Sequence, residues 1–433
     1  MKNNSPRQLI WEFLVDTERS QGYINLGIEK LHQNLPEKER SFATELVFGS
    51  VRQRLRLDWT LERYLSREID SELRELLRLG AYESLFMRTP AHAVVFEYVE
   101  LAKKVLGSAR STMVNAVLRK IVANQEVLRD PNGLSLEVET SHPEWIVNSF
   151  AQIIQGEEEL RAELHSHNEA AAVQAVSFTN LDPDEAQKDV RMPFGYSLKK
   201  PPHEIKEIRT GSGFIQDFGS QIIAEILLAT DPERKYQWLD LCAGPGGKFT
   251  YLAHFLSKNQ LAGIELHEHR SKLIRDRNPG YQITTGDAGN VKERLGEEGA
   301  EVSAPFQRIL IDAPCTGLGA LRRRPDARWR KRESDLKSLL DLQRNLLLSG
   351  AGLLDDEGII GYATCSPHIL ETKVQVADFL RKNSDFQIHR INPAWIDSDY
   401  HSAITDQGFL QLMTGEHSTD GMFLALLERK KKE

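Results

Sequence analysis

The chain is poor in cysteine, with three in 433 residues. So few cysteines exclude the disulfide framework that stabilises small secreted domains. Long apolar runs are also missing, and the first residues, MKNNSP, show no signal-peptide pattern. We therefore expect a cytoplasmic protein with free thiols and no association with membranes.

A positive net charge is missing as well, because 55 Lys and Arg face 63 Asp and Glu, which gives −8. This balance argues weakly against a nucleic-acid partner, so the distribution of the charge has to be considered. One basic cluster, RRRPDARWRKR, occupies 322–332. It could be a solvated helix end, but its position directly after the segment DAPC at 312–315 favours contact with phosphates. The candidate contacts are Arg322, Arg323, Arg324 and Arg328.

The length predicts two or three domains, and the apolar pattern changes along the chain accordingly. Apolar residues recur at helical spacing through 7–125, which predicts an all-α bundle, and the turn-rich DPNG at 130–133 follows it. A helix over 145–164, a strand over 172–178 and a helix start at 182–186 then predict a small α/β unit.

From about residue 206 onward, candidate strands and helices alternate, which predicts a mostly parallel, doubly wound sheet. The expected strands are 238–241, 261–265, 281–285, 308–312, 359–364 and 422–427. The expected helices are 249–256, 269–277, 336–354 and 372–381. We therefore predict a multidomain chain with an all-α domain at 1–130, a small α/β subdomain at 141–205 and a Rossmann-like α/β domain at 206–430.

A glycine-rich loop, DLCAGPGGK at 240–248, follows a strand and precedes a helix. Its glycines let the backbone approach a ligand closely, and the helix that follows presents free N–H groups. The loop is not a P-loop, because Phe249 follows Lys248 where Ser or Thr is required. It is also an incomplete dinucleotide fingerprint, so its ligand has to be identified from other residues.

Acidic residues end four successive candidate strands, at Asp240, Glu265, Asp287 and Asp312. Any one of them alone is more simply a helix N-cap, but capping does not explain why four successive strands end in an acid. Ligands of such sheets bind at the carboxyl ends of the strands, where carboxylates can hold ribose hydroxyls. The ligand that fits best is S-adenosylmethionine, with its ribose diol, adenine and amino group, and we expect no metal.

Two of the three cysteines, Cys315 and Cys365, each follow an apolar strand, in RILIDAPC and GIIGYATCS. They could be buried strand-end residues or a redox disulfide. Their place beside the cofactor loop favours nucleophilic chemistry, for which Lys248, His368 or the basic cluster could supply a positive setting. The third cysteine, Cys242, is expected to pack as a small apolar residue or to lend its backbone to the cofactor.

Together these motifs resemble the RNA cytosine-5 methyltransferases. The resemblance rests on DLCAGPGGK, DAPCTG, the TCS at 364–366, RRRPDARW and FIQDFGSQ at 214–221. It is strongest to the bacterial 16S rRNA enzymes of the RsmB type, whose N-terminal domain is similar to the antitermination factor NusB. The segment FATELVFGSVR at 42–52 carries that part of the likeness.

The resemblance implies a mechanism and a set of site residues. Cys365 attacks C6 of the cytosine, Cys315 assists product release, and Asp312 and Lys248 complete the catalytic group. Because DNA enzymes of this chemistry attack from a Pro-Cys motif, the two thiol roles could be exchanged. The base must be single-stranded or flipped out. The implied cofactor-binding residues are Cys242, Ala243, Gly244, Pro245, Gly246, Gly247, Lys248, Glu265, Asp287 and Asp312.

The same resemblance implies RNA, most simply 16S rRNA, as the partner of a monomeric enzyme. Two alternatives are compatible with the sequence. One is a tRNA cytosine-5 methyltransferase, because enzymes that act on tRNA share these motifs. The other is a non-catalytic, antitermination-like RNA-binding factor, which the intact loop, acids and thiols disfavour.

Overall fold

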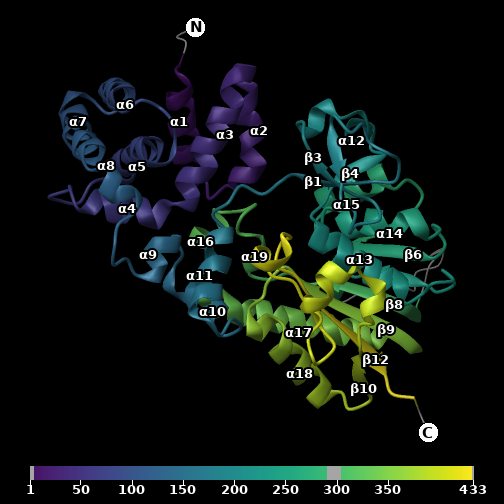
Figure 1. Cartoon of the computed structure of the whole chain (residues 1–433). Helices are drawn as coiled ribbons and strands as arrows, with labels where there is room; N and C mark the ends of the chain where they lie inside the picture. Colours follow the sequence, from purple (N-terminus) through teal and green to yellow (C-terminus); the bar gives the residue numbers. More distant parts are fainter. Residues whose placement is uncertain (1–3, 290–303, 432–433) are drawn as a thin grey trace. The chain divides into compact units, whose positions relative to one another are not determined.

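The structure is a computed structural model that describes residues 4–289 and 304–431 (Figure 1). The chain forms two compact units, which are described separately. The first comprises Met1–Ala151, Gly156–Ala170 and Leu321–Arg330, and the second comprises Gln152–Gln155, Ala171–Ala320 and Lys331–Glu433. The chain therefore returns to the first unit for one short segment late in the sequence.

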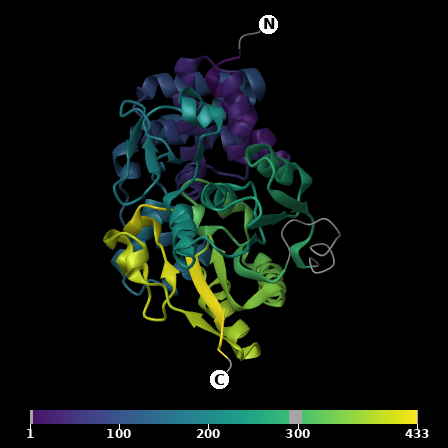
Figure 2. The same ribbon diagram turned by 90° about the vertical axis from the view of Figure 1, so that its right-hand side faces the viewer.

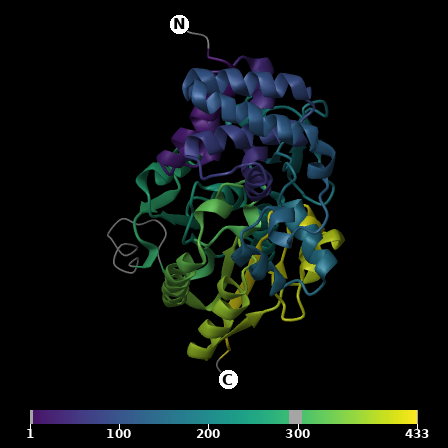
Figure 3. The same cartoon turned by 90° about the vertical axis from the view of Figure 1, so that its left-hand side faces the viewer.

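The first unit is entirely helical, as expected. Its helices are α1 (Pro6–Arg19), α2 (Ile24–Gln33), α3 (Glu37–Arg52), α4 (Arg54–Glu62), α5 (Ser71–Phe86), α6 (Ala91–Val105), α7 (Ser108–Ala123), α8 (Gln125–Arg129), α9 (Leu136–Thr140), α10 (Glu144–Ala151), α11 (Glu157–Ser166) and α16 (Ala327–Arg330). Helices α6 and α7 lie side by side in Figures 1 and 3. One continuous core of buried apolar residues, including Leu46, Leu76 and Leu118, joins the first seven helices.

Hydrogen-bonding side chains mark where two of these helices begin. Ser5 accepts a hydrogen bond from the Gln8 N–H before α1, and Asp70 accepts one from the Leu73 N–H before α5. Such caps satisfy N–H groups that the first turn of a helix leaves free. None of the helices that the structure describes has both the length and the apolar character that crossing a bilayer requires.

The second unit contains two sheets. The smaller is antiparallel, with strand order β2-β3-β1-β4, and consists of β1 (Gln174–Ser177), β2 (Ala186–Lys188), β3 (Gly195–Leu198) and β4 (Gly213–Ile215). The larger has the path β10-β12-β9-β8-β5-β6-β7, with β11 paired to β12. Its strands are β5 (Trp238–Asp240), β6 (Leu261–Glu265), β7 (Gln282–Thr285), β8 (Phe306–Asp312), β9 (Leu354–Thr364), β10 (Phe386–His389), β11 (Leu410–Gln411) and β12 (Phe423–Arg429).

The larger sheet is parallel from β7 to β9, whereas β12 runs antiparallel to β9 and β10. Figure 2 shows β12 in yellow, leading to the C-terminus. The helices of the second unit are α12 (Lys206–Thr210), α13 (Phe218–Ala229), α14 (Gly247–Phe255), α15 (Glu268–Arg277), α17 (Leu336–Leu353), α18 (Lys373–Lys382) and α19 (Thr414–His417). The chain order reverses at β5, and in doubly wound sheets ligands bind at such a point.

Both faces of the larger sheet are buried, because successive strand residues point to opposite sides. In β8, Leu310 packs in a core with residues of α13, α14 and α15. Its neighbours Ile309 and Ile311 pack in a second core with residues of α17 and α18. This two-sided burial explains why β8 and β9 contain near-continuous apolar runs instead of alternating ones.

The strands expected from 238 onward are all present, with ends that differ by a few residues. The small α/β subdomain expected at 141–205 is not a separate compact unit. Its helices α10 and α11, which Gly156 separates, belong to the helical unit. Its strand β1 shares a hydrophobic core with the larger sheet, in which Val176 packs with residues of α13.

The helix start expected at 182–186 is also absent. Asp182 instead accepts a hydrogen bond from the Asp184 N–H, which forms a turn, and β2 begins at Ala186. Aspartate side chains favour such turns because they bind the backbone two residues further on.

Candidate active site

The acidic residues expected at strand ends do lie along one edge of the larger sheet. Asp312, Asp240 and Glu265 are the last residues of the neighbouring parallel strands β8, β5 and β6, and Asp287 follows β7. Asp240 and Glu265 are buried, and Asp287 is exposed. The parallel direction of these strands brings residues far apart in sequence to one edge.

The glycine-rich loop connects β5 to α14 at this edge. Gly244 and Gly246 have φ values of +57° and +91°, in a region of backbone conformation that residues other than glycine rarely adopt. A Cβ atom on Gly244 would meet only the Cys242 carbonyl oxygen, at 3.9 Å, so the loop offers open space to a ligand. Gly246 is the N-cap residue of α14, whose first N–H groups point toward this loop.

Lys248 in the first turn of α14 forms an ion pair with Asp312, with Nζ 2.8 Å from Oδ2. Burial alone would lower the pKa of Lys248, but the charge of Asp312 and its hydrogen bond, together with the charge of Cys365, raise it overall. Lys248 therefore stays positively charged near the Cys365 thiol. Burial and the charge of Asp312 raise the pKa of Asp240 to about 7.

The two thiols meet at the same edge. Cys315 follows β8, Cys365 follows β9, and their sulfur atoms lie 3.4 Å apart as free thiols. The hydrogen bond to Cys365 and burial raise the pKa of Cys315 well above its ordinary value. Cys315 therefore keeps its proton and can donate a hydrogen bond to the sulfur of Cys365.

A buried glutamate that the sequence did not reveal holds the two thiol loops together. Glu371 accepts hydrogen bonds from the Thr316 N–H, at 2.9 Å, and from the Thr316 hydroxyl. The same hydroxyl lies 2.9 Å from Ser366 Oγ, and Gln343 Nε2 donates to Glu371 at 3.1 Å. Glu371 thus fixes Thr316, the residue after Cys315, and the Thr316 hydroxyl in turn contacts Ser366, the residue after Cys365.

A close backbone contact fixes the Cys315 loop from its other side. The Gly319 N–H donates to the Cys365 carbonyl at 3.0 Å, and the Gly421 N–H donates to the Gly319 carbonyl at 2.8 Å. A Cβ atom on Gly319 would lie 1.8 Å from the Gly421 oxygen, so only glycine fits there. Neither Gly319 nor its partner Gly421 was identified from the sequence, because the two glycines lie about a hundred residues apart in the chain.

The structure does not support His368 as a positive group near the thiols. Burial lowers the pKa of His368, so its imidazole is neutral near pH 7. Its Nδ1 accepts a hydrogen bond from the Leu370 N–H, at 3.2 Å, at the start of a short helical turn. Of the three predicted sources of positive charge, Lys248 is the one that the structure places near Cys365 and Asp312.

Residues 322–330 of the basic cluster lie in the helical unit, and part of this segment is not available to RNA. Arg328 is fully buried, and its guanidinium donates to the carbonyl oxygens of Arg52, Ser141 and His167. The prediction is therefore corrected for Arg328, and also for Arg322, which is buried. Arg323 is partly exposed and Arg324 is exposed, so both keep the proposed role.

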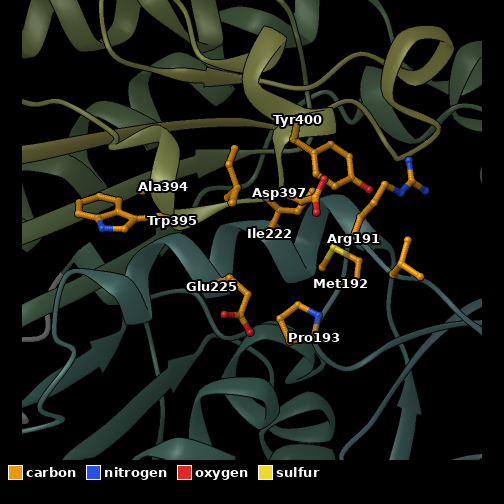
Figure 4. A pocket seen from close by; sticks show the side chains of 11 residues that line it. Arg191, Met192, Pro193, Ile222, Glu225, Ala394, Trp395, Asp397 and Tyr400 are labelled. Carbon is orange, nitrogen blue, oxygen red and sulfur yellow. The ribbon is translucent and has the colours of Figure 1, made fainter.

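A cavity of about 280 Å³ elsewhere in the second unit contains none of the predicted site residues. It is lined by Met192, Ile222, Glu225, Trp395 and Tyr400 among others, and Figure 4 shows these side chains around α13. The candidate active site is defined instead by the strand ends and their loops.

Comparison with known proteins assigns this arrangement to a family. The 16S rRNA methyltransferase RsmB/F family matches residues 226–428, and the NusB family matches residues 4–123. A relative from Mycobacterium tuberculosis (strain CDC 1551 / Oshkosh), named as a methyltransferase, is 35% identical over 98% of this chain and 96% of its own. This chain belongs to the RsmB/F methyltransferase family.

A further relative agrees with that assignment, and two solved structures share the fold. The ribosomal RNA small subunit methyltransferase B of Proteus mirabilis (strain HI4320) is 28% identical over 93% of each chain. The crystal structure of PH0851 superposes with a TM-score of 0.76 at 22% identity, over 98% of this chain and 99% of that one. NSun6 from Pyrococcus horikoshii, solved with SFG, gives a TM-score of 0.54 at 16% identity, over 67% and 99%. At these identities the structures show the shared fold.

As a member of the RsmB/F family, the chain is an S-adenosylmethionine-dependent RNA methyltransferase. The residues present fit this cofactor. The loop from Cys242 to Lys248 presents backbone with open space beside Gly244, and Glu265 ends β6 where a carboxylate can bind ribose hydroxyls. Burial raises the pKa of Cys242, and the carboxyl groups of Asp240, Asp312, Glu265 and Asp287 raise it further, so all four acids act on this loop. Such a field suits a cofactor that carries positive charge.

Proposed function

We propose that the chain methylates C5 of a cytidine in 16S rRNA through a transient bond between Cys365 Sγ and C6 of the base. The observation that carries this proposal is the 3.4 Å approach of the two thiols at the edge that holds the glycine loop and Asp312. The family description and the name of the Proteus mirabilis relative support small-subunit ribosomal RNA as the substrate.

Covalent attack overcomes the weak nucleophilicity of cytosine C5. Addition of a thiolate to C6 turns the ring into an enamine, whose C5 can accept an electrophilic methyl group. S-adenosylmethionine supplies that methyl group when it is bound. Asp312, held by Lys248, would bind the N3 and N4 edge of the base, which must be out of its stack to reach the site.

The two thiols are suited to different parts of this reaction. Cys315 keeps its proton because its pKa is raised, and its S–H can stabilise a Cys365 thiolate, the nucleophilic form. After methylation a base removes the proton from C5, the C6–S bond breaks and its electron pair returns to Cys365. The Cys315 S–H then stabilises the departing sulfur anion, which assigns product release to Cys315.

The experiment is methyl transfer from radiolabelled S-adenosylmethionine to unmodified 16S rRNA by cysteine variants. Cys365→Ala should lose activity by about 1,000-fold or more, because no covalent adduct can form. Cys315→Ala should still attack but release slowly, so a protein–RNA adduct should persist on a denaturing gel.

The double variant Cys315→Ala with Cys365→Ala is the control and should give no adduct. An adduct that accumulates in Cys365→Ala instead would reverse the two roles. Transfer to tRNA in preference to 16S rRNA would contradict the proposed substrate.

A further inference from the structure

Gln216 has a buried carboxamide whose oxygen is unsatisfied, directly beside the glycine-rich loop. It lies between β4 and α13, and its side chain is only 6% exposed. Its Oε1 has no hydrogen-bond partner among the residues that the structure describes. Buried polar atoms are almost always hydrogen-bonded, so an unpaired one at a ligand site indicates a contact with that ligand.

The rest of Gln216 is held firmly in place. Its N–H donates to the Gln174 carbonyl at 3.0 Å, and its own carbonyl accepts from Gln221 Nε2 at 3.0 Å. Its Nε2 donates to Ser220 Oγ at 3.2 Å. A Cβ atom on Gly247 would meet this Nε2 at 3.6 Å, so the carboxamide lies against the first turn of α14. The side chain is therefore positioned in advance over the cofactor loop.

The charges around the loop indicate what the oxygen binds. Glu265 and Asp312 place negative charge there, and among the described residues Lys248 forms its ion pair with Asp312. A cationic N–H donor is favoured in such a field, and hydrogen bonds from charged donors are the stronger ones. S-adenosylmethionine offers one group of that kind, the ammonium of its methionine end.

We propose that Gln216 is a cofactor-binding residue whose Oε1 accepts a hydrogen bond from the methionine ammonium group of S-adenosylmethionine. The inference rests on the cofactor site described above and assigns Gln216 in addition to the loop and the four acids. It explains why the oxygen is held unpaired in the interior, since binding of the cofactor satisfies it.

The test uses isothermal titration of the full chain with two nucleosides. S-adenosylhomocysteine keeps the ammonium group, and 5′-methylthioadenosine lacks the amino-acid end altogether. Gln216→Leu should weaken the binding of S-adenosylhomocysteine by about 10-fold to 100-fold. It should change the binding of 5′-methylthioadenosine by less than about twofold, because that ligand has nothing for Oε1 to accept.

Two further variants separate this role from a structural one. Gln216→Glu keeps an acceptor oxygen and should bind S-adenosylhomocysteine at least as tightly as the wild type. Gln237→Leu is the matched control. Gln237 Oε1 is also buried and has no hydrogen-bond partner in the described part of the chain, but it lies just before β5, at the opposite end of that strand from the loop. Its affinity for both nucleosides should equal that of the wild type.

Equal losses for both nucleosides in Gln216→Leu, or no loss for S-adenosylhomocysteine, would overturn the inference. A raised KM for RNA with unchanged S-adenosylhomocysteine affinity would also overturn it and assign Gln216 to the nucleic acid. Failure of the wild type to bind S-adenosylhomocysteine would instead count against the proposed function itself.

Discussion

At the scale of the residue, Asp240 and Asp312 end neighbouring strands of the active-site edge, and Lys248 lies beside them. Lys248 forms its ion pair with Asp312, and the buried Asp240 has no ion pair with another residue of the described chain. Burial and the charge of Asp312 therefore raise the pKa of Asp240 from the ordinary 3.8 to about 7. The Cys242 N–H still donates to Asp240 Oδ1 at 3.3 Å, so the side chain keeps a structural role in either protonation state.

This shift predicts a pH dependence of stability. Between pH 3.8 and about 7 the unfolded chain loses the Asp240 proton and the folded chain keeps it, so stability falls as the pH rises through this window. Above about pH 7 the folded chain carries the full free-energy cost of an ionised, buried Asp240. Asp240→Asn cannot ionise, and it should gain about 2–4 kcal/mol over the wild type at pH 8 but little at pH 4.

Urea unfolding of the wild type and Asp240→Asn across this pH range measures the difference between their free energies of unfolding. The contributions of all other titrating groups cancel in that difference. Asparagine keeps an oxygen that can accept from the Cys242 N–H. A constant difference between wild type and variant from pH 4 to pH 8 would show that Asp240 does not titrate in this way.

At the scale of the element, the loops after the parallel strands carry the site because the strands end together at one edge. The β5–α14 loop depends on glycine where φ is positive. Gly246 has φ +91°, and a Cβ atom there would lie 3.0 Å from Ile274 Cγ1 of α15. Here the backbone conformation and the packing of α15 both require glycine.

Gly246→Ala should therefore lower the free energy of unfolding by about 1–2 kcal/mol and also weaken binding of S-adenosylhomocysteine, because the loop must shift. Gly211→Ala is the matched control. Gly211 has φ +83° at the end of α12, and a Cβ atom there meets nothing within 4 Å. Gly211→Ala should lose comparable stability but keep its affinity for S-adenosylhomocysteine. Chemical denaturation and titration calorimetry measure the two effects, and a loss of affinity in both variants would contradict the local explanation.

At the scale of the whole molecule, the chain builds each unit from segments that are far apart in sequence. Leu321–Arg330 returns to the helical unit, where Arg328 donates to three backbone carbonyls and to Asn168 Oδ1, at 2.9 Å. Burial and the charge of Arg52 lower the pKa of Arg328 to about 9. The interior accepts this cation because carbonyl oxygens surround it.

Arg328→Met should lower the free energy of unfolding by about 3 kcal/mol or more, because it leaves several buried oxygens without donors. Arg324→Met is the control on the same segment. Arg324 is exposed, so this change should alter stability by less than about 0.5 kcal/mol. Under the proposed function it should weaken RNA binding instead. Calorimetric melting and RNA titration of the two variants test the contrast, and equal melting temperatures would contradict the anchoring role of Arg328.

The sequence alone determined the elements and the chemistry that is local to them. Apolar periodicity indicated the helices and the buried strands, and acids, glycines and cysteines at strand ends indicated the site, because each signal lies within a few residues. Only the tertiary structure decided what depends on distant packing. It brought Cys315 to 3.4 Å from Cys365, placed Glu371 between their loops, and buried Arg328 in the helical unit. Such contacts follow from strand order and core packing, which no local pattern contains.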